Sequence, residues 1–252
     1  PDEDMPGIDY IIPDISYLKG KEKNIRGVII THAHYDHIGG IPHIMDRIGN
    51  PPIYMTELTR GIVLKRQDDF KDKNPLNIHV VKKIDRLRLG IFNVEFFHVN
   101  HTIPDAVGLS IGTPVGNIIH TGDFKFDHSP VSDAPADIAK IARLGSEGVL
   151  ALMSDSTDSK TPGYSLSESL IAKTLDEIFE HTDGRLIIAT FAALISRIQS
   201  VVTAAEKHGR KLAVDGFSMR ANVEIARSLG YLQAKKTTFI PINKVNDYAD
   251  DK

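Results

Sequence analysis

The chain of 252 residues is long enough for one large hydrophobic core or two smaller ones. Its 41% hydrophobic and 25% charged residues are typical of a soluble globular protein, and its formal charge of −3 gives no global attraction to nucleic acid. No apolar run reaches the roughly 20 residues of a membrane-spanning helix, and the absence of cysteine restricts any metal site to histidine and carboxylate ligands. A cytoplasmic location is therefore expected.

Short apolar runs that end in polar turns fill the first half of the chain and predict strands. These runs cover residues 25–31, 51–56, 77–82, 92–99, 116–123 and 148–155. Helix-like pieces lie between them at 41–49 and 136–145, and Gly145 stands where a helix C-terminal cap is expected.

From about residue 165 the pattern changes to alternating helices and strands. Helices are predicted over 165–181, 193–209 and 218–230, and strands over 185–191 and 211–216. Ser165 and Glu168 have the spacing of a capping box for the first of these helices. Such βαβ alternation favours a parallel sheet, and we place a domain boundary near residue 164, which gives domains 1–164 and 165–252.

The segment THAHYDHIGG, residues 31–40, concentrates possible metal ligands at the end of a predicted strand. Alternate side chains of an extended segment share a face, so His32, His34 and Asp36 are expected to project together, with His37 pointing elsewhere. Gly39 and the glycine after it give the backbone freedom to turn away. Neighbouring imidazoles favour zinc or a similar divalent ion.

Further candidate ligands lie at the ends of later strand-like runs, where sites gather in α/β proteins. They are His98, His101 and Asp105 in one segment, His120, Asp123 and Asp127 in the next, and Asp155 in the last.

Five segments together resemble the metallo-β-lactamase superfamily and, within it, the ribonuclease J-like members of the β-CASP group. They are EDMPGIDYIIPDISYL (3–18), THAHYDHIGGIPHI (31–44), NHTIPDAVGLSIGTPVGNIIHTGDFKFD (100–127), LMSDSTDSKTPGYSLSE (152–168) and ATFA (189–192). The resemblance implies an α/β fold: a metallo-β-lactamase αββα sandwich without its first strands, followed by a partial Rossmann-like β-CASP domain.

The resemblance also implies roles for individual residues. One metal ion is expected on His32, His34 and His101, a second on Asp36 and His37, and both on the bridging Asp123. Asp36 would also orient the attacking hydroxide, and Asp155 would move a proton or position a neighbouring acid. Ser196 stands where the family places a histidine that handles the scissile phosphate, and with Arg197 it is the candidate substrate-binding pair. His98 and His120 match no ligand and are expected to be ordinary side chains near strands.

The activity that the resemblance implies is hydrolysis of RNA by metal-activated hydroxide, as a 5′→3′ exonuclease and an endonuclease. Two Zn²⁺ ions are expected, with Mn²⁺ as the alternative, and RNA is the expected partner, with no membrane association. The chain begins after the family's first strands and ends before its closing motif, so reduced activity and a homo-oligomer that covers the open sheet are expected. A small-molecule hydrolase of the lactamase or glyoxalase type, and a non-catalytic RNA-binding or assembly subunit, remain open as alternatives.

Overall fold

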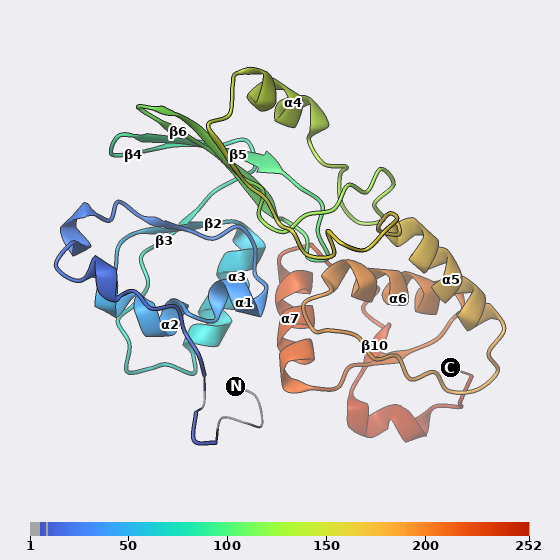
Figure 1. The fold of residues 1–252 in the computed structure, drawn as a ribbon. Helices are drawn as coiled ribbons and strands as arrows, with labels where there is room; N and C mark the ends of the chain where they lie inside the picture. Colours follow the sequence, from blue (N-terminus) through green and yellow to red (C-terminus); the bar gives the residue numbers. More distant parts are fainter. Residues whose placement is uncertain (1–5, 9, 252) are drawn as a thin grey trace.

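The computed structural model describes residues 6–8 and 10–251, which form three groups of elements (Figure 1). The first group holds β1 to β3 with α1 to α3, the second holds β4 to β8 with α4, and the third holds α5 to α7 with β9 and β10. Short 3-10 helices lie at Ser16–Leu18, Glu22–Asn24, Asp46–Ile48 and Ile242–Asp247. No helix within the described part of the chain is long and apolar enough to cross a bilayer.

The first sheet is parallel, with its strands in the order β1, β2, β3. Its elements are β1 (Val28–Ile29), α1 (Tyr35–Ile38), α2 (Ile41–Ile44), β2 (Ile53–Met55), α3 (Glu57–Gln67) and β3 (Ile78–Val80). Successive strand residues point to opposite faces, so Ile53 and Met55 enter the core under α2 and α3 while Tyr54 packs toward the second sheet.

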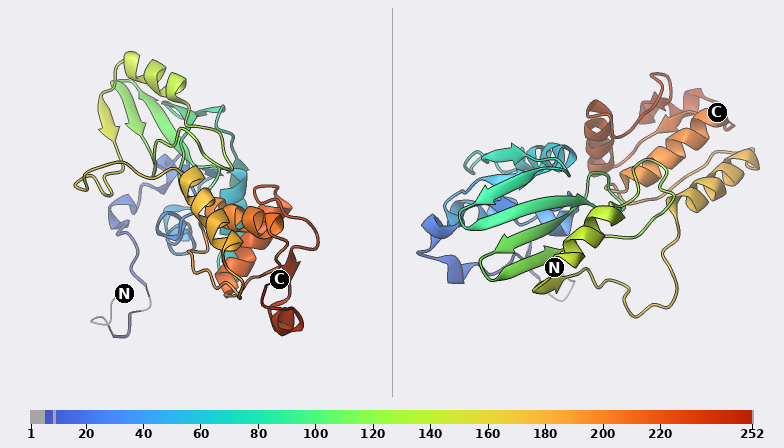
Figure 2. Two further views of the ribbon diagram at one scale, coloured as in Figure 1. Left: turned by 90° about the vertical axis from the view of Figure 1, so that its right-hand side faces the viewer. Right: turned by 90° about the horizontal axis from the view of Figure 1, so that it is seen from above.

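The second sheet has the order β4, β5, β6, β7, β8, with antiparallel neighbours except for the parallel β7 and β8. Its elements are β4 (Arg86–Leu89), β5 (Phe92–His98), β6 (Val107–Thr113), β7 (Gly116–His120), α4 (Ile138–Ser146) and β8 (Ala151–Met153). On β5, Phe96 packs with Tyr54 of the first sheet, whereas Phe97 packs with Leu144 of α4. Figure 2 shows α4 against this sheet. The layers therefore run helix, sheet, sheet, helix, which confirms the predicted sandwich.

The third group surrounds a short parallel pair of strands. Its elements are α5 (Glu168–Glu180), α6 (Ile195–Lys207), β9 (Leu212–Ala213), α7 (Phe217–Ser228) and β10 (Phe239–Ile240). Ile195 of α6 and Ala226 of α7 are fully buried in the same cluster as Leu58 of α3. One hydrophobic core therefore joins the third group to the first.

Three local predictions are wrong. Residues 185–191 form no strand because no described strand pairs with them, and Ile187 remains 92% exposed. Helix α5 is capped by Ser167, whose hydroxyl accepts from the Ser169 amide, so the box from Ser165 to Glu168 does not form. Helix α4 continues past Gly145 to Ser146. The boundary predicted near residue 164 stays a prediction.

Candidate metal centre

The first ligand-bearing segment changes from extended to helical within a few residues. His34 has extended backbone angles and occupies the N-cap position of α1, which begins at Tyr35, without a side-chain capping bond. The helical turn brings His37 back toward the site, so the expectation that His37 points elsewhere is wrong. Gly39 is required here for a close approach, because a Cβ atom on it would lie 2.6 Å from the Tyr35 carbonyl oxygen.

Two other loops bring ligands to the same place. His101 follows β5, and Asp123 follows β7. A bridge between Asn100 and Lys125 joins these two loops side by side. Gly122 adopts φ +61°, a conformation that favours glycine, and thereby turns the chain into Asp123.

Six side chains converge as two groups that share Asp123. Ligand atoms of His32, His34, His101 and Asp123 all lie within 4.8 Å of one another, and so do those of Asp36, His37 and Asp123. The Asp123 Oδ2 atom lies 3.7, 3.3 and 3.8 Å from the Nε2 atoms of His32, His37 and His101. The Nδ1 atom of His34 lies 3.0 Å from His101 Nε2.

The electrostatics of the first group suit a bound cation. His32 is 1% exposed, and burial followed by the neighbouring imidazoles lowers its pKa to about 2. Burial and the nearby His34 lower the pKa of His101 to about 4. Both rings are therefore neutral at pH 7, which is the form that binds metals.

One buried atom in the group lacks a hydrogen-bond partner among the described residues. The Nε2 atom of His32 is buried without a partner, while its Nδ1 atom lies 3.0 Å from the Thr31 hydroxyl. If Nδ1 carries the proton and donates to Thr31, a lone pair on Nε2 faces the other ligands. An orphaned buried nitrogen is costly, and a divalent ion would satisfy it, so the residues fit a metal.

The family of the chain follows from sequence comparison. A family model of the metallo-beta-lactamase superfamily matches residues 5–173. The chain belongs to the metallo-beta-lactamase superfamily. A second family model, that of the ribonuclease J beta-CASP domain, matches residues 183–252.

Curated relatives are similar over nearly the whole chain. It is 41% identical to ribonuclease J of Thermus thermophilus over 99% of its own length and 44% of the relative's. It is 37% identical to ribonuclease J2 of Bacillus subtilis, over 98% of its length and 44% of that protein's. The chain thus spans less than half the length of these relatives. A solved structure of a protein of unknown function from Enterococcus faecalis has the same fold, with a TM-score of 0.64 and 19% identity over 89% of this chain and 57% of that one.

Three acidic candidates, Asp105, Asp127 and Asp155, lie outside the two ligand groups, and Asp155 is the one with an expected catalytic role. Burial would raise its pKa, but hydrogen bonds from Thr157 and from the Phe124 amide, with His101 nearby, lower it overall. Its amide donates to the Thr121 hydroxyl, which follows β7. Asp155 is therefore a fixed negative charge beside His101.

Ser196 and Arg197 lie in the first turn of α6 and have different surroundings. Ser196 is 7% exposed and lines a cavity of about 10 Å³ together with His101 and Lys125. Arg197 donates from Nε to Glu168 at 3.1 Å, so its guanidinium is already paired. The structure thus brings Ser196 toward the site and holds Arg197 against α5.

Sequence reasoning missed Lys125 and Glu168, which form a partly buried ion pair at 3.0 Å next to the centre. Asp127, a candidate ligand by sequence, instead accepts from the Glu168 amide and the Ser167 hydroxyl. The sequence signal for this charged cluster was the alternation of charged residues in DFKFD, residues 123–127, which places Lys125 beside Asp127.

The two histidines that match no family ligand contact backbone atoms. His98 is 4% exposed, and its Nε2 atom lies 2.9 Å from the Ala134 carbonyl oxygen. The Nδ1 atom of His120 accepts from the Gly122 amide.

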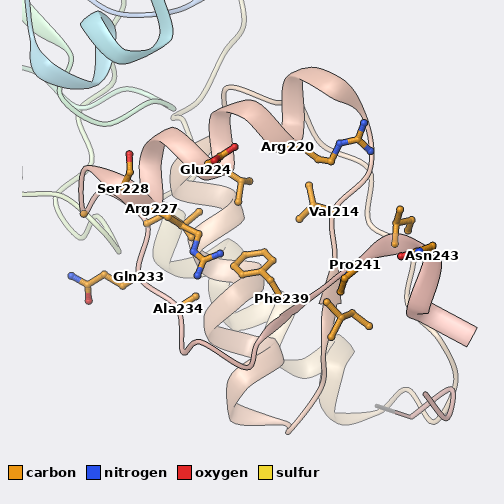
Figure 3. A pocket seen from close by; sticks show the side chains of 15 residues that line it. Val214, Arg220, Glu224, Arg227, Ser228, Gln233, Ala234, Phe239, Pro241 and Asn243 are labelled. Atoms are coloured by element: carbon orange, nitrogen blue, oxygen red, sulfur yellow. The ribbon is translucent and has the colours of Figure 1, made fainter. Parts of the chain in front are cut away.

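A separate pocket of about 970 Å³ lies between α7 and the segment that contains β10 (Figure 3). The guanidinium of Arg227 lies 4.8 Å from the centre of the Phe239 ring within it. Among the described residues that line it, Glu224 is a carboxylate and none is a histidine. It therefore lacks the donor set of the metal centre.

Proposed function

We propose that this chain is the metal-binding part of a metal-dependent ribonuclease that hydrolyses RNA phosphodiesters, as a 5′→3′ exonuclease and an endonuclease. The observation that carries the proposal is the paired group of four histidines and two aspartates around the unpartnered Nε2 atom of His32. The relatives named ribonuclease J, similar over nearly the whole chain, support RNA as the substrate.

In this proposal His32, His34, His101 and Asp123 hold one ion, and Asp36, His37 and Asp123 hold the second. Zn²⁺ suits the imidazole-rich donors, with Mn²⁺ as the alternative. When bound, the two ions supply Lewis acidity and neutralise charge on the phosphodiester.

The protein groups have separate tasks. The Asp36 side chain is 78% exposed and accepts a hydrogen bond from the attacking water. Asp155, a negative charge beside His101, positions a neighbouring acid or passes on a proton, and the Ser196 hydroxyl donates to the phosphate, with Arg197 next to it in α6. Serine cannot act as an acid near neutral pH, so we expect slower cleavage than a histidine at position 196 would support.

We further propose that the chain self-associates and acts in the cytoplasm. Strand β8 lies at the edge of its sheet, with Leu152 64% and Met153 54% exposed, and such edges pair with other chains. Light scattering that shows a monomer at all concentrations would contradict self-association.

Cleavage of a labelled 5′-monophosphorylated RNA with added Zn²⁺ or Mn²⁺ tests the main proposal. We expect cleavage that a chelator abolishes and that Asp123→Asn lowers by about 100-fold or more, because the variant weakens both ion sites. Asp215→Asn, at a surface aspartate with a 74% exposed side chain, should cleave normally. Hydrolysis of a chromogenic lactam without RNA cleavage would instead identify a small-molecule hydrolase. Elemental analysis that finds no metal would identify a non-catalytic subunit.

A further inference from the structure

A row of stacked side chains leads away from the metal centre across the first group of elements. We call Tyr10, His43, Phe70, Arg66 and Tyr35, in that order, the stacked row. Ring centres are 4.1 Å apart between Tyr10 and His43, whose planes are tilted by 32°, and 5.1 Å apart between His43 and Phe70, which meet edge to face. The Arg66 guanidinium carbon lies 5.4 Å from the Phe70 ring centre and 4.1 Å from that of Tyr35. Segments far apart in sequence therefore form one continuous row.

One end of the row lies inside the ligand-bearing motif. Tyr35 stands between His34 and Asp36 and begins α1. Its ring lies close to Gly39, where an added Cβ atom would come within 3.1 Å of a ring carbon. Tyr35 is nevertheless 62% exposed, and Tyr10 at the far end is 56% exposed. Both ends of the row thus offer aromatic surface to a ligand.

The middle of the row carries positive charge. The Nε atom of Arg66 is buried without a hydrogen-bond partner, and no ion pair joins Arg66 to a carboxylate in the described part of the chain. Burial, and then the charges of Arg66 and Lys73, lower the pKa of His43. The row therefore presents aromatic rings around an unneutralised cation, although the chain as a whole is acidic.

We propose that the stacked row binds a single-stranded segment of the RNA next to the phosphodiester that is cleaved. Tyr10 and Tyr35 would stack on bases, and Arg66 would bind a backbone phosphate between them. Proteins that bind single strands combine aromatic stacking surfaces with a positive path for the backbone, and both features are present here. This inference rests on the proposed function, because it takes RNA as the substrate.

The test measures binding without cleavage. Fluorescence anisotropy would follow a labelled single-stranded oligouridine of about 12 nucleotides, with a chelator present so that no RNA is cut. We expect Tyr35→Leu and Arg66→Ala each to weaken binding by about 5- to 100-fold, as loss of one stacking or phosphate contact does. Tyr35→Phe keeps the ring and should bind within about twofold of the wild type.

A matched control is Tyr17→Leu. Tyr17 is 68% exposed on the same N-terminal part of the chain and lies outside the stacked row. Equal losses in Tyr17→Leu and Tyr35→Leu, or no measurable binding by the wild type, would overturn the inference. Metal content measured by elemental analysis should be unchanged in Tyr35→Leu. A lower content would mean that Tyr35 supports α1 rather than RNA, and would also overturn it.

The cleavage assay distinguishes this inference from the proposed function. RNA cleavage by a wild type whose binding is insensitive to Tyr35→Leu and Arg66→Ala would leave the nuclease proposal intact and exclude the row as a binding surface. Binding that depends on the row, without metal-dependent cleavage, would support the row and remove the nuclease proposal.

Discussion

At the residue scale, burial lowers the pKa values of three histidines of the metal centre, His32, His34 and His101, before any ion arrives. His32 is buried so completely that a second proton on its ring would be strongly disfavoured, and its Nε2 atom has no hydrogen-bond partner among the described residues. A water molecule bound to Nε2, or a proton on it, would place another polar or charged group in the protein interior, which costs free energy. The folded chain therefore holds these nitrogens in the form that a cation needs.

This neutral state makes the stability of the metal-free chain depend on pH. The pKa values of His32 and His101 fall from 6.5 to about 2 and about 4 on folding, so below pH 6.5 the unfolded chain binds more protons than the folded chain. The free energy of unfolding should therefore fall as the pH drops from about 6.5 to 4, by about 1 kcal/mol per pH unit for each ring.

Urea unfolding in the presence of a chelator, at several pH values, measures this slope. His101→Gln removes one titrating ring and should reduce the slope by about 1 kcal/mol per pH unit in this range. An unchanged slope in that variant would show that His101 is not held neutral in the folded chain.

At the element scale, the sequence predicted the strands that end in ligands, because alternating apolar runs and the polar turns after them are local signals. It also predicted α6 and α7 near their observed positions. The prediction of a strand over 185–191 was wrong, because a strand needs a partner for its backbone hydrogen bonds and a local sequence pattern does not show whether one is present. The turn of His37 into the site depends on α1, a single helical turn too short for periodicity to detect.

The role of Glu168 likewise depends on contacts between distant residues, which a local sequence pattern does not reveal. Its spacing from Ser165 suggested a helix cap, but its side chain instead pairs with Lys125 and Arg197. Lys125 lies two residues after Asp123 and forms the bridge to Asn100. One buried carboxylate thus ties α5 and α6 to the loops that carry Asp123 and His101, and only the folded chain brings these residues together.

Glu168→Gln should destabilise the chain by about 2–4 kcal/mol, because the partly buried Arg197 loses its carboxylate partner and the partly buried Lys125 keeps only Asp127, at 3.6 Å. It should also weaken metal binding by about 10-fold through the Asp123 loop. Thermal unfolding and a competitive metal titration measure the two effects. Glu147→Gln alters an exposed pair with Arg143 on α4 and should leave both unchanged. Equal metal affinity in Glu168→Gln and the wild type would show that the pair stabilises the fold without positioning the ligands.

At the scale of the whole molecule, the third group is not an independent lobe. Gly61 lies inside α3, where a Cβ atom would come within 2.7 Å of Ile225 on α7. Glycine inside a helix costs about 1 kcal/mol relative to alanine, so its presence reflects the close contact of the two helices. A second contact joins Tyr231, just after α7, to Asp105 in the loop that carries His101: the Tyr231 hydroxyl donates to Asp105 Oδ2 at 2.7 Å.

The contact between Tyr231 and Asp105 should connect the third group to the metal centre. Asp105 has φ +68°, which is strained for a residue with a side chain, and burial raises its pKa although the bond from Tyr231 opposes that rise. Tyr231→Phe removes only the hydroxyl. We expect it to lower the free energy of unfolding by about 1–2 kcal/mol and to weaken metal binding several-fold, because the loop loses one of the donors that hold Asp105, the others being Leu58 and Thr56.

Calorimetric metal titration and urea unfolding of Tyr231→Phe check both effects, with Tyr164→Phe as the control at a fully exposed tyrosine. Metal affinity is the decisive readout, because a purely local role for the hydroxyl would lower stability alone. If Tyr231→Phe binds metal as tightly as Tyr164→Phe, α7 and the His101 loop are not coupled, and the third group acts on the centre only through α5 and α6.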